Sequence, residues 1–323
     1  MIRRIALGAA LSLITVSCHS GNGTLSTGGD SVATVPRRFD HVVIIVLENA
    51  DADRVLRVRY FRELARQGAY LTNYHALTHP SYPNYLALVA GSTFQGDRRA
   101  RPDPAAYRAF DRGDAQLVID APTVADRLDA AGLTWDAFAE DYPDTSRVPR
   151  RCVLARAAGA GKGGAAPGRF IYTRKHVPLL SFARIQRDPA ACARIRDLRW
   201  LRPDSLAAYT FVTPNMIHDA HDAPLDSAAA WLGRFLPRLT SDPRVMARML
   251  VVVTFDEADN PWWARFSARS NRVYTVLLGG MVRSGTTDGT WYTHLSLLRT
   301  IEANFGLAPS LVPGEAPIQG VWR

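Results

Sequence analysis

The stretch that decides the fold is HVVIIVLEN, which runs from His41 to Asn49 in a chain of 323 residues. From His41 to Leu47 it is a continuous apolar run rich in β-branched side chains. Such a run is typical of a strand buried on both faces, as the strands of parallel sheets are. Two polar residues, Glu48 and Asn49, follow directly. The sequence therefore predicts a central parallel strand with polar side chains at its carboxyl end.

Similar apolar runs recur along the chain and alternate with helical patterns. Strands are predicted over residues 133–139, 208–213, 249–255 and 272–278. Helices are predicted over residues 54–67, from about Pro83, from the start signal at Thr123 and Asp126 to Gly132, and from His294 to Phe305 before Gly306. This alternation predicts an α/β fold with a mainly parallel central sheet flanked by helices.

Polar residues stand at the ends of three predicted strands. Besides Glu48 and Asn49, they are Asn215 after one strand and Asp256 and Glu257 after another. In open α/β sheets, ligands bind at the carboxyl ends of the strands. The alternative is that these residues are solvated turn residues, but three such coincidences favour a site. Carboxylate and amide oxygens suit Ca²⁺, Mg²⁺ or Mn²⁺ better than a thiolate-loving metal.

The segment THPSYPNY, from Thr78 to Tyr85, places a serine between two prolines at the start of a predicted helix. The positive end of the helix favours an alkoxide at Ser81 and the binding of phosphate. Asn84, one turn later, is able to donate to a phosphoryl oxygen. The alternative is that Ser81 or Thr78 only caps the helix. The turn by itself does not decide between these two readings.

The N-terminal segment indicates export. A short basic start, an apolar run from Ile5 to Val16 and small residues up to Cys18 are typical of a signal peptide over residues 1–17. A flexible linker over residues 18–38 and one domain over residues 39–323 are expected to follow. The segment before Cys18 also suggests lipidation of that cysteine and attachment to a membrane. Localisation is therefore expected to be periplasmic, secreted or membrane-anchored.

Two cysteines lie within the predicted domain, Cys152 and Cys192. In an oxidising compartment they are expected to form a disulfide, and the alternative is two unrelated buried thiols. The formal net charge is +9 and the arginines are scattered. A basic surface attracts phosphate esters, anionic lipid headgroups or nucleic acid, although a GC-rich genome would give the same composition. No nucleic-acid partner is expected. The Gly- and Ala-rich residues 157–168 lack the spacing of a phosphate loop and indicate a surface insertion.

Five segments in order resemble the bacterial phosphoesterase family of acid phosphatases and phospholipases C, a branch of the alkaline-phosphatase-like superfamily. They are HVVIIVLENAD from His41, HPSYPNYLALVAGST from His79, TPNMIHDAHD from Thr213, VVVTFDEAD from Val251 and THLSLLRTIEANFG from Thr293. The form SYPNYLA is more similar to the acid phosphatase branch. The resemblance implies an alkaline-phosphatase-like fold and a hydrolase of phosphate esters.

The resemblance also implies roles for individual residues. Ser81 matches the nucleophile, and His221 and His294 match catalytic histidines that face the pocket. Substrate phosphate is expected to contact Asn84, His176 and Asp219. A divalent metal ion (Ca, Mg, Mn or Zn) is expected on Glu48, Asn49, Ser81, Asp256 and Glu257. Cys152 and Cys192 fall where related enzymes have a disulfide. The sequence departs from the family pattern at Val177, Ala229 and Leu295 and in the insertion before Phe170, while the matched active-site ligands are all retained.

These observations predict an exported, metal-dependent phosphomonoesterase that forms a phosphoseryl intermediate. Its substrate is expected to be a phosphate monoester or a phospholipid headgroup, with phosphoinositides among the candidates. The first alternative is a phosphodiesterase of the phospholipase C type. The second belongs to another class, a surface lipoprotein that keeps the fold as a binding module.

Overall fold

A computed structural model describes residues 37–95, 118–143, 152–154, 172–259 and 270–323. The predicted signal peptide, Cys18, most of the predicted linker and the Gly- and Ala-rich insertion lie outside these residues. Among the helices that the structure describes, none is long and apolar enough to cross a membrane.

The described domain is built on one eight-stranded sheet with the strand order β5-β4-β6-β1-β7-β8-β2-β9. Its parallel part comprises β5 (Ile195–Asp197), β4 (Trp135–Ala139), β6 (Tyr209–Thr213), β1 (His41–Leu47) and β7 (Met249–Phe255). On the other side, β8 (Thr275–Leu278) runs antiparallel to its neighbours β7 and β2 (Ala69–Leu71), and β9 (Thr286–Asp288) pairs with β2 in parallel. The mainly parallel α/β sheet is confirmed.

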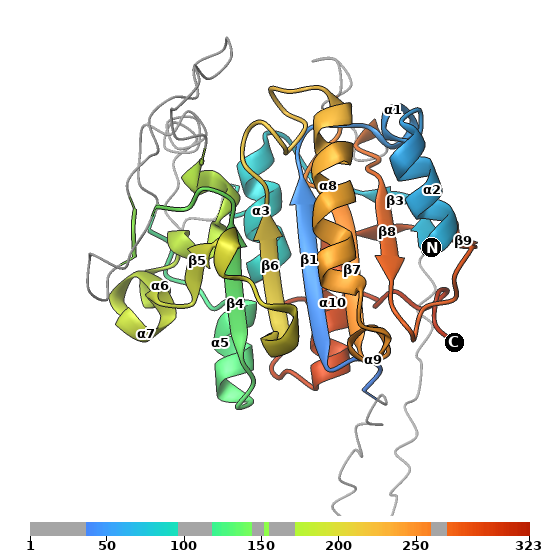
Figure 1. Cartoon of the computed structure of the whole chain (residues 1–323). Helices are drawn as coiled ribbons and strands as arrows, with labels where there is room; N and C mark the ends of the chain where they lie inside the picture. The colour runs from blue at the N-terminus through green and yellow to red at the C-terminus, as the bar shows by residue number, and fades with distance from the viewer. Residues whose placement is uncertain (1–36, 96–117, 144–151, 155–171, 260–269) are drawn as a thin grey trace, which may run out of the picture. The chain divides into compact units, whose positions relative to one another are not determined.

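The strand β1 lies at the centre of the sheet, as its sequence predicts. Every residue from Val42 to Leu47 is 0% exposed. Figure 1 shows α8 (Leu225–Thr240) in front of β1 and β7, with α3 (Ser81–Ala90) and α10 (His294–Phe305) behind the sheet. Because helices cover both faces, a polar residue within β1 would lose its hydration without gaining a partner. Polar side chains are therefore confined to the strand end.

The helices agree with the sequence in part. The predicted helix over residues 54–67 is two helices, α1 (Ala52–Val55) and α2 (Arg59–Gln67). α5 (Val124–Ala130) begins at a Thr123 capping box, and α10 has the predicted bounds and ends at Gly306 with φ 63°. The remaining short elements are β3 (Tyr74–His75), β10 (Tyr292–Thr293), α6 (Ala183–Arg187), α7 (Pro189–Cys192) and α9 (Pro243–Met246).

The predicted disulfide is present between Cys152 and Cys192, 40 residues apart in sequence. The closed loop contains Arg174–His176, a short 3₁₀ turn whose first and last side chains are buried. The cross-link therefore restricts the chain on both sides of this turn. It also agrees with the oxidising compartment that the N-terminal sequence indicates.

We expect the double variant Cys152→Ser/Cys192→Ser to lose about 3–4 kcal/mol of unfolding free energy. A disulfide closing a 40-residue loop restricts the unfolded chain by roughly this amount. Urea denaturation measures the loss. A reducing agent should lower the denaturation midpoint of the wild type and leave that of the variant unchanged. An equal effect of the reductant on both proteins would contradict the prediction.

Candidate active site

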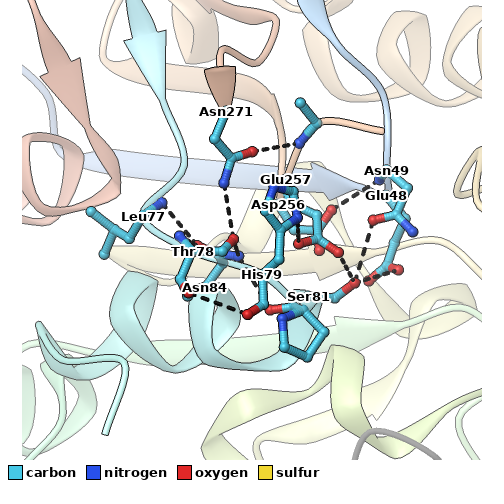
Figure 2. A network of polar contacts seen from close by, with 12 residues as sticks. Glu48, Asn49, Leu77, Thr78, His79, Ser81, Asn84, Asp256, Glu257 and Asn271 are labelled. Carbon is cyan, nitrogen blue, oxygen red and sulfur yellow. Dashed lines mark hydrogen bonds and ion pairs between the residues drawn. The ribbon is translucent and has the colours of Figure 1, made fainter. Parts of the chain in front are cut away.

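Two pairs of polar residues meet at the carboxyl edge of the central strands (Figure 2). Glu48 and Asn49 follow β1, and Asp256 and Glu257 follow β7, which is the parallel neighbour of β1 with Leu47 opposite Phe255. The backbone N–H of Asn49 donates to Asp256 Oδ1 at 3.0 Å. Asn49 has φ 46°, in the left-handed region that asparagine tolerates better than most residues. The predicted convergence of these four residues is present in the structure.

Ser81 is the first residue of α3 and lies against this edge. Its hydroxyl donates to Glu257 Oε1 at 2.9 Å and is 3.4 Å from both Glu48 Oε2 and Asn49 Oδ1. The residue is 2% exposed. The N-cap position belongs to Pro80, and no side chain caps the helix. The reading of Ser81 as a helix cap is therefore wrong, and its hydroxyl is directed into the carboxylate cluster.

The carboxylate cluster contains Glu48, Asp219, Asp256 and Glu257, all of them buried. Burial, and then the neighbouring charges of Glu48 and Glu257, raise the pKa of Asp256 well above its usual range. Burial followed by Glu48 does the same to the pKa of Asp219, and burial raises the pKa of Glu257. Burial alone would also raise the pKa of Glu48, but His176 and Lys175 hold it well below its usual range. The cluster therefore gathers more carboxyl groups than its cationic neighbours keep in the ionised form.

The cluster has the chemistry of a site for a divalent cation. Asp256 Oδ2 is buried and accepts no hydrogen bond from the described residues. Within those residues, no group of three or more His, Cys, Asp or Glu side chains forms a ready metal site. The donors gathered here include the amide of Asn49 and the hydroxyl of Ser81 as well as carboxylates. Such hard oxygen donors suit Mg²⁺, Ca²⁺ or Mn²⁺, so the residues present fit a cation.

Basic side chains contact two of these carboxylates. His176 Nε2 lies 2.7 Å from Glu48 Oε1, and Lys175 Nζ lies 3.7 Å from Glu48 Oε2. His79 Nδ1 lies 2.5 Å from Glu257 Oε2, the carboxylate that also accepts from Ser81. Sequence reasoning assigned no role to His79 or Lys175. The available signals were the position of His79 two residues before Ser81 and the position of Lys175 one residue before His176.

Asn84 does not have the surroundings expected of a phosphate-binding amide. Its Oδ1 accepts from the backbone N–H groups of Leu77 and Thr78 at 3.0 and 3.1 Å. Its Nδ2 donates to the carbonyl of Thr78 at 2.7 Å and lies 3.4 Å from that of Pro80. The side chain is 0% exposed. These contacts make Asn84 a positioning residue that holds the turn before Ser81, which corrects the expected role.

A second amide, Asn271, connects the two halves of the site, and sequence reasoning missed it. Its Nδ2 donates to the carbonyl of Thr78 at 2.9 Å, and its Oδ1 accepts from the N–H of Ala258 at 2.8 Å (Figure 2). One buried side chain thus bridges the turn before Ser81 and the turn after Glu257. An asparagine far from both motifs in sequence gives no pattern that would identify it.

His294 is buried behind the site and is not placed to act on a substrate. Its Nε2 donates to the backbone carbonyl of Asp256 at 2.8 Å, and its Nδ1 faces the hydroxyl of Tyr74 at 3.1 Å. Burial lowers the pKa of His294 to about 4. Both ring nitrogens are therefore occupied and the ring is neutral at physiological pH. The expectation that His294 faces the pocket as a proton donor is corrected: it positions the backbone of Asp256.

His294 should make the fold sensitive to acid. Its pKa falls from the ordinary value of 6.5 to about 4 on folding, so the unfolded chain binds an extra proton between these values. Stability is complete above pH 6.5 and falls by about 3 kcal/mol as the pH drops to 4. Urea denaturation across this range measures the slope. The variant His294→Gln should show a shallower slope, and an unchanged slope would contradict the assignment.

The remaining predicted residues lie beside the cluster. Asp219 Oδ1 accepts from the N–H of His221 at 2.9 Å, and its Oδ2 lies 3.7 Å from His176 Nδ1. His221 is partly exposed, and its Nδ1 lies 2.8 Å from Asp222 Oδ1. His218, another histidine in a polar context, instead contacts Glu140 at 2.8 Å. Among the predicted catalytic histidines, His221 is thus the accessible one.

Comparison with solved structures supports the fold. A protein of the alkaline phosphatase superfamily from Vibrio parahaemolyticus aligns with a TM-score of 0.56 at 10% identity, covering 88% of this chain and 72% of that one. A phosphonate monoester hydrolase from Silicibacter pomeroyi aligns with a TM-score of 0.52 at 12% identity, covering 88% and 78% of the two chains. Identities this low show the fold alone. The predicted alkaline-phosphatase-like fold is confirmed.

Sequence comparison gives nearer relatives. The phosphate-repressible acid phosphatase of Penicillium chrysogenum is 34% identical over 281 residues, which cover 84% of this chain and 60% of the fungal one. The phosphatidylinositol-3-phosphatase of Mycobacterium tuberculosis is 32% identical over 307 residues, 93% of this chain and 88% of the relative. The chain thus spans about three fifths of the length of the fungal acid phosphatases it matches.

The family itself is established by the extent of these matches. The model of the Phosphoesterase family matches residues 56–308, a range that includes Ser81, Asp256 and Glu257. The resemblance to this family that the five ordered segments indicated is confirmed. The chain belongs to the Phosphoesterase family.

Proposed function

We propose that this protein is an exported, metal-dependent phosphomonoesterase of the acid phosphatase type, with Ser81 as its nucleophile. The observation that carries the proposal is the position of the Ser81 hydroxyl at the carboxyl ends of the parallel strands. It lies 2.9 Å from Glu257 and 3.4 Å from Glu48 and Asn49. The relatives named acid phosphatase and phosphatidylinositol-3-phosphatase support a monoester substrate. The predicted signal peptide and the disulfide support export.

The first chemical step is attack by Ser81 Oγ on the phosphorus of the ester. A P–O bond forms to Ser81, the P–O bond to the alcohol breaks, and the serine proton moves toward Glu257. Burial raises the pKa of this carboxyl group, which makes it a better proton acceptor than an exposed glutamate. His79, 2.5 Å from the other oxygen of Glu257, orients the carboxylate. Water then hydrolyses the phosphoserine and restores the hydroxyl.

A divalent cation would be held by Glu48, Asn49, Ser81, Asp256 and Glu257. When bound, such an ion offsets negative charge on phosphoryl oxygens and favours the serine alkoxide. The surrounding side chains keep these donors in place: Lys175 and His176 contact Glu48, and His294 holds the backbone of Asp256. The buried, unsatisfied oxygen of Asp256 supports this assignment.

His221 is the proposed proton donor to the leaving alcohol. Its Nδ1 is paired with Asp222, which leaves Nε2 for the substrate, and Asp219 holds its backbone N–H. A neutral alcohol leaves more readily than an alkoxide, so a donor matters most for alkyl esters. His176 and Asp219 remain the candidates for contact with the phosphoryl group.

We expect His221→Gln to lower kcat for an alkyl phosphate about 100-fold. With p-nitrophenyl phosphate the loss should be only a few-fold, because nitrophenolate leaves without a proton. Asp222→Asn should show the same preference with a smaller loss. Steady-state kinetics with both esters measures the effect, and His218→Gln, which alters a histidine that contacts Glu140 instead, is the control. Equal losses for both esters would contradict the role of proton donor.

The function itself is tested by comparing ester classes. The purified protein should hydrolyse p-nitrophenyl phosphate, lose this activity on chelation, and contain a divalent metal by elemental analysis. Activity mainly on p-nitrophenylphosphorylcholine would replace the proposal with a phosphodiesterase of the phospholipase C type. A protein that hydrolyses neither ester, whether or not it contains metal, would favour the alternative of a non-catalytic binding module.

A further inference from the structure

A cavity beside α8 is lined by none of the residues assigned to the catalytic site. It has a volume of about 450 Å³ and lies between α8 and the segments that follow β4 and β5. A volume of this size accommodates a small organic ligand. α8 begins after the loop that leaves the carboxyl end of β6 and leads back to the start of β7. Arg234 therefore lies roughly 14 Å along the helix from its first residue, on the flank of the sheet.

The floor of the cavity is aromatic and fixed. Trp231 and Phe235, four residues apart on α8, stack with their ring centroids 4.9 Å apart and an interplanar angle of 16°. His218 lies over Trp231, with centroids 6.4 Å apart, and is itself held by Glu140 at 2.8 Å. The stacked rings cover part of each other's faces, and together they form a fixed apolar floor of the cavity.

The acidic groups at one end of the cavity already have partners. Glu140 accepts from His218 and from the N–H of Asn215. Asp141 accepts from Asn215 Nδ2 at 2.7 Å. Asp197 accepts from the backbone N–H of Arg199 at 2.9 Å, and it lies 3.7 Å from the guanidinium of the same residue. Because these carboxylates already have hydrogen-bond or ion-pair partners, they do not require a cation in the cavity.

The basic groups on the helix are different. Arg234 and Arg238 line the cavity next to the aromatic floor, one turn apart on α8. In the described ranges neither guanidinium has a hydrogen bond, an ion pair or an aromatic ring as partner. Like charges at this spacing repel each other on a helix, and an anion between them would remove the repulsion. Guanidinium groups bind oxyanions with two parallel hydrogen bonds.

We infer that this cavity is a second ligand site, separate from the catalytic edge, for a small organic oxyanion. The phosphate or carboxylate group binds between Arg234 and Arg238, and the apolar part of the ligand contacts the floor formed by Trp231 and Phe235. The inference does not depend on Ser81 or on a metal. It assigns a binding role to a surface that takes no part in the proposed reaction.

Phenylphosphonate, which is not a phosphate ester and resists hydrolysis, is the probe for this site. Isothermal titration of the full wild-type chain, with a chelator present to remove any cation from the carboxylate cluster, should show binding of this probe. The variant Arg234→Gln/Arg238→Gln should weaken this binding at least tenfold and leave the hydrolysis of p-nitrophenyl phosphate unchanged. Benzoate in a parallel titration distinguishes a carboxylate ligand from a phosphate ligand.

The matched control is Arg59→Gln/Arg244→Gln, which removes two exposed arginines that pair with Glu63 and Asp242 elsewhere on the surface. It lowers the net charge equally and should bind the probe as the wild type does. Equal weakening in both double variants would reduce the effect to general electrostatics and overturn the inference. Unchanged binding in Arg234→Gln/Arg238→Gln would also overturn it, and the single variant Arg238→Gln repeats the test with a smaller perturbation.

Discussion

The variant Ser81→Ala should lose about four orders of magnitude in kcat, because it removes the hydroxyl that is proposed to attack phosphorus. Ser81 lies in the first turn of α3 with its Oγ 2.9 Å from Glu257 and 3.4 Å from Glu48. Alanine leaves this packing nearly intact while removing the atom that attacks phosphorus. Removal of a nucleophile that works together with a base costs roughly this factor or more. Steady-state hydrolysis of p-nitrophenyl phosphate measures the loss.

Ser92→Ala is the matched control. Ser92 lies just beyond the other end of the same helix, where its hydroxyl accepts from the N–H of Phe94 at 3.0 Å. This variant should keep its activity within about twofold, since it touches no group of the site. Acid quenching during turnover of a labelled ester should trap phosphoserine in the wild type and none in Ser81→Ala. Full activity of Ser81→Ala would contradict the proposed mechanism.

Asp256→Asn should change activity and stability in opposite directions. Burial, Glu48 and Glu257 raise the pKa of Asp256, so its ionised form costs stability in the metal-free protein. Because the folded-state pKa is raised, this cost is absent below the unfolded value of about 4 and grows as the pH rises. The neutral amide removes it, and Asn keeps an oxygen for the N–H of Asn49. We expect a gain of about 1–2 kcal/mol at neutral pH.

The same substitution should lower kcat/KM roughly a thousandfold, about 4 kcal/mol of transition-state stabilisation, through weaker metal binding. Urea denaturation in the presence of a chelator measures the stability gain, and titration with Mg²⁺, Ca²⁺, Mn²⁺ or Zn²⁺ measures the affinity. Asp136→Asn is the control, since Asp136 on β4 pairs with Arg196 on β5 at 2.9 Å, away from the site. A destabilised or fully active Asp256→Asn protein would contradict the proposal that buried Asp256 is held among other carboxylates in order to bind a metal.

The parts of the fold that the sequence predicts are those with strong periodicity. β1 and β7 have the predicted bounds because their residues are buried on both faces and hence apolar throughout. β2, β5 and β9, each three residues long, are too short to show a pattern. The predicted strand 272–278 is β8, but its antiparallel direction depends on pairing with β7 and β2. Residues 225–240 carry a helical stripe that went unassigned, partly because Pro237 lies inside the helix.

The candidate site divides in the same way. Ser81, Asp256 and Glu257 stand directly at element ends, where the direction of the chain fixes the direction of the side chain. The functions of Asn84 and His294 depend on what packs around them, and sequence motifs do not specify whether a polar residue faces a pocket or a backbone carbonyl. Asn271 belongs to no motif at all. Three-dimensional contacts were needed to separate the groups that touch substrate from the groups that hold them.

The place of β7 in the sheet has a consequence for biosynthesis. β7 pairs with β1, although roughly two hundred residues separate them in sequence. This pairing places Asp256 and Glu257 at the edge of the sheet where Glu48 and Ser81 lie. A ribosome-bound chain that ends before β7 can pair β1 with β6, but it lacks the pairing of β1 with β7 and two of the four acidic side chains of the cluster. Contacts this distant in sequence also form slowly. The proposed catalytic site is therefore incomplete until β7 has been synthesised, and a shorter nascent chain is expected to be inert toward phosphate esters.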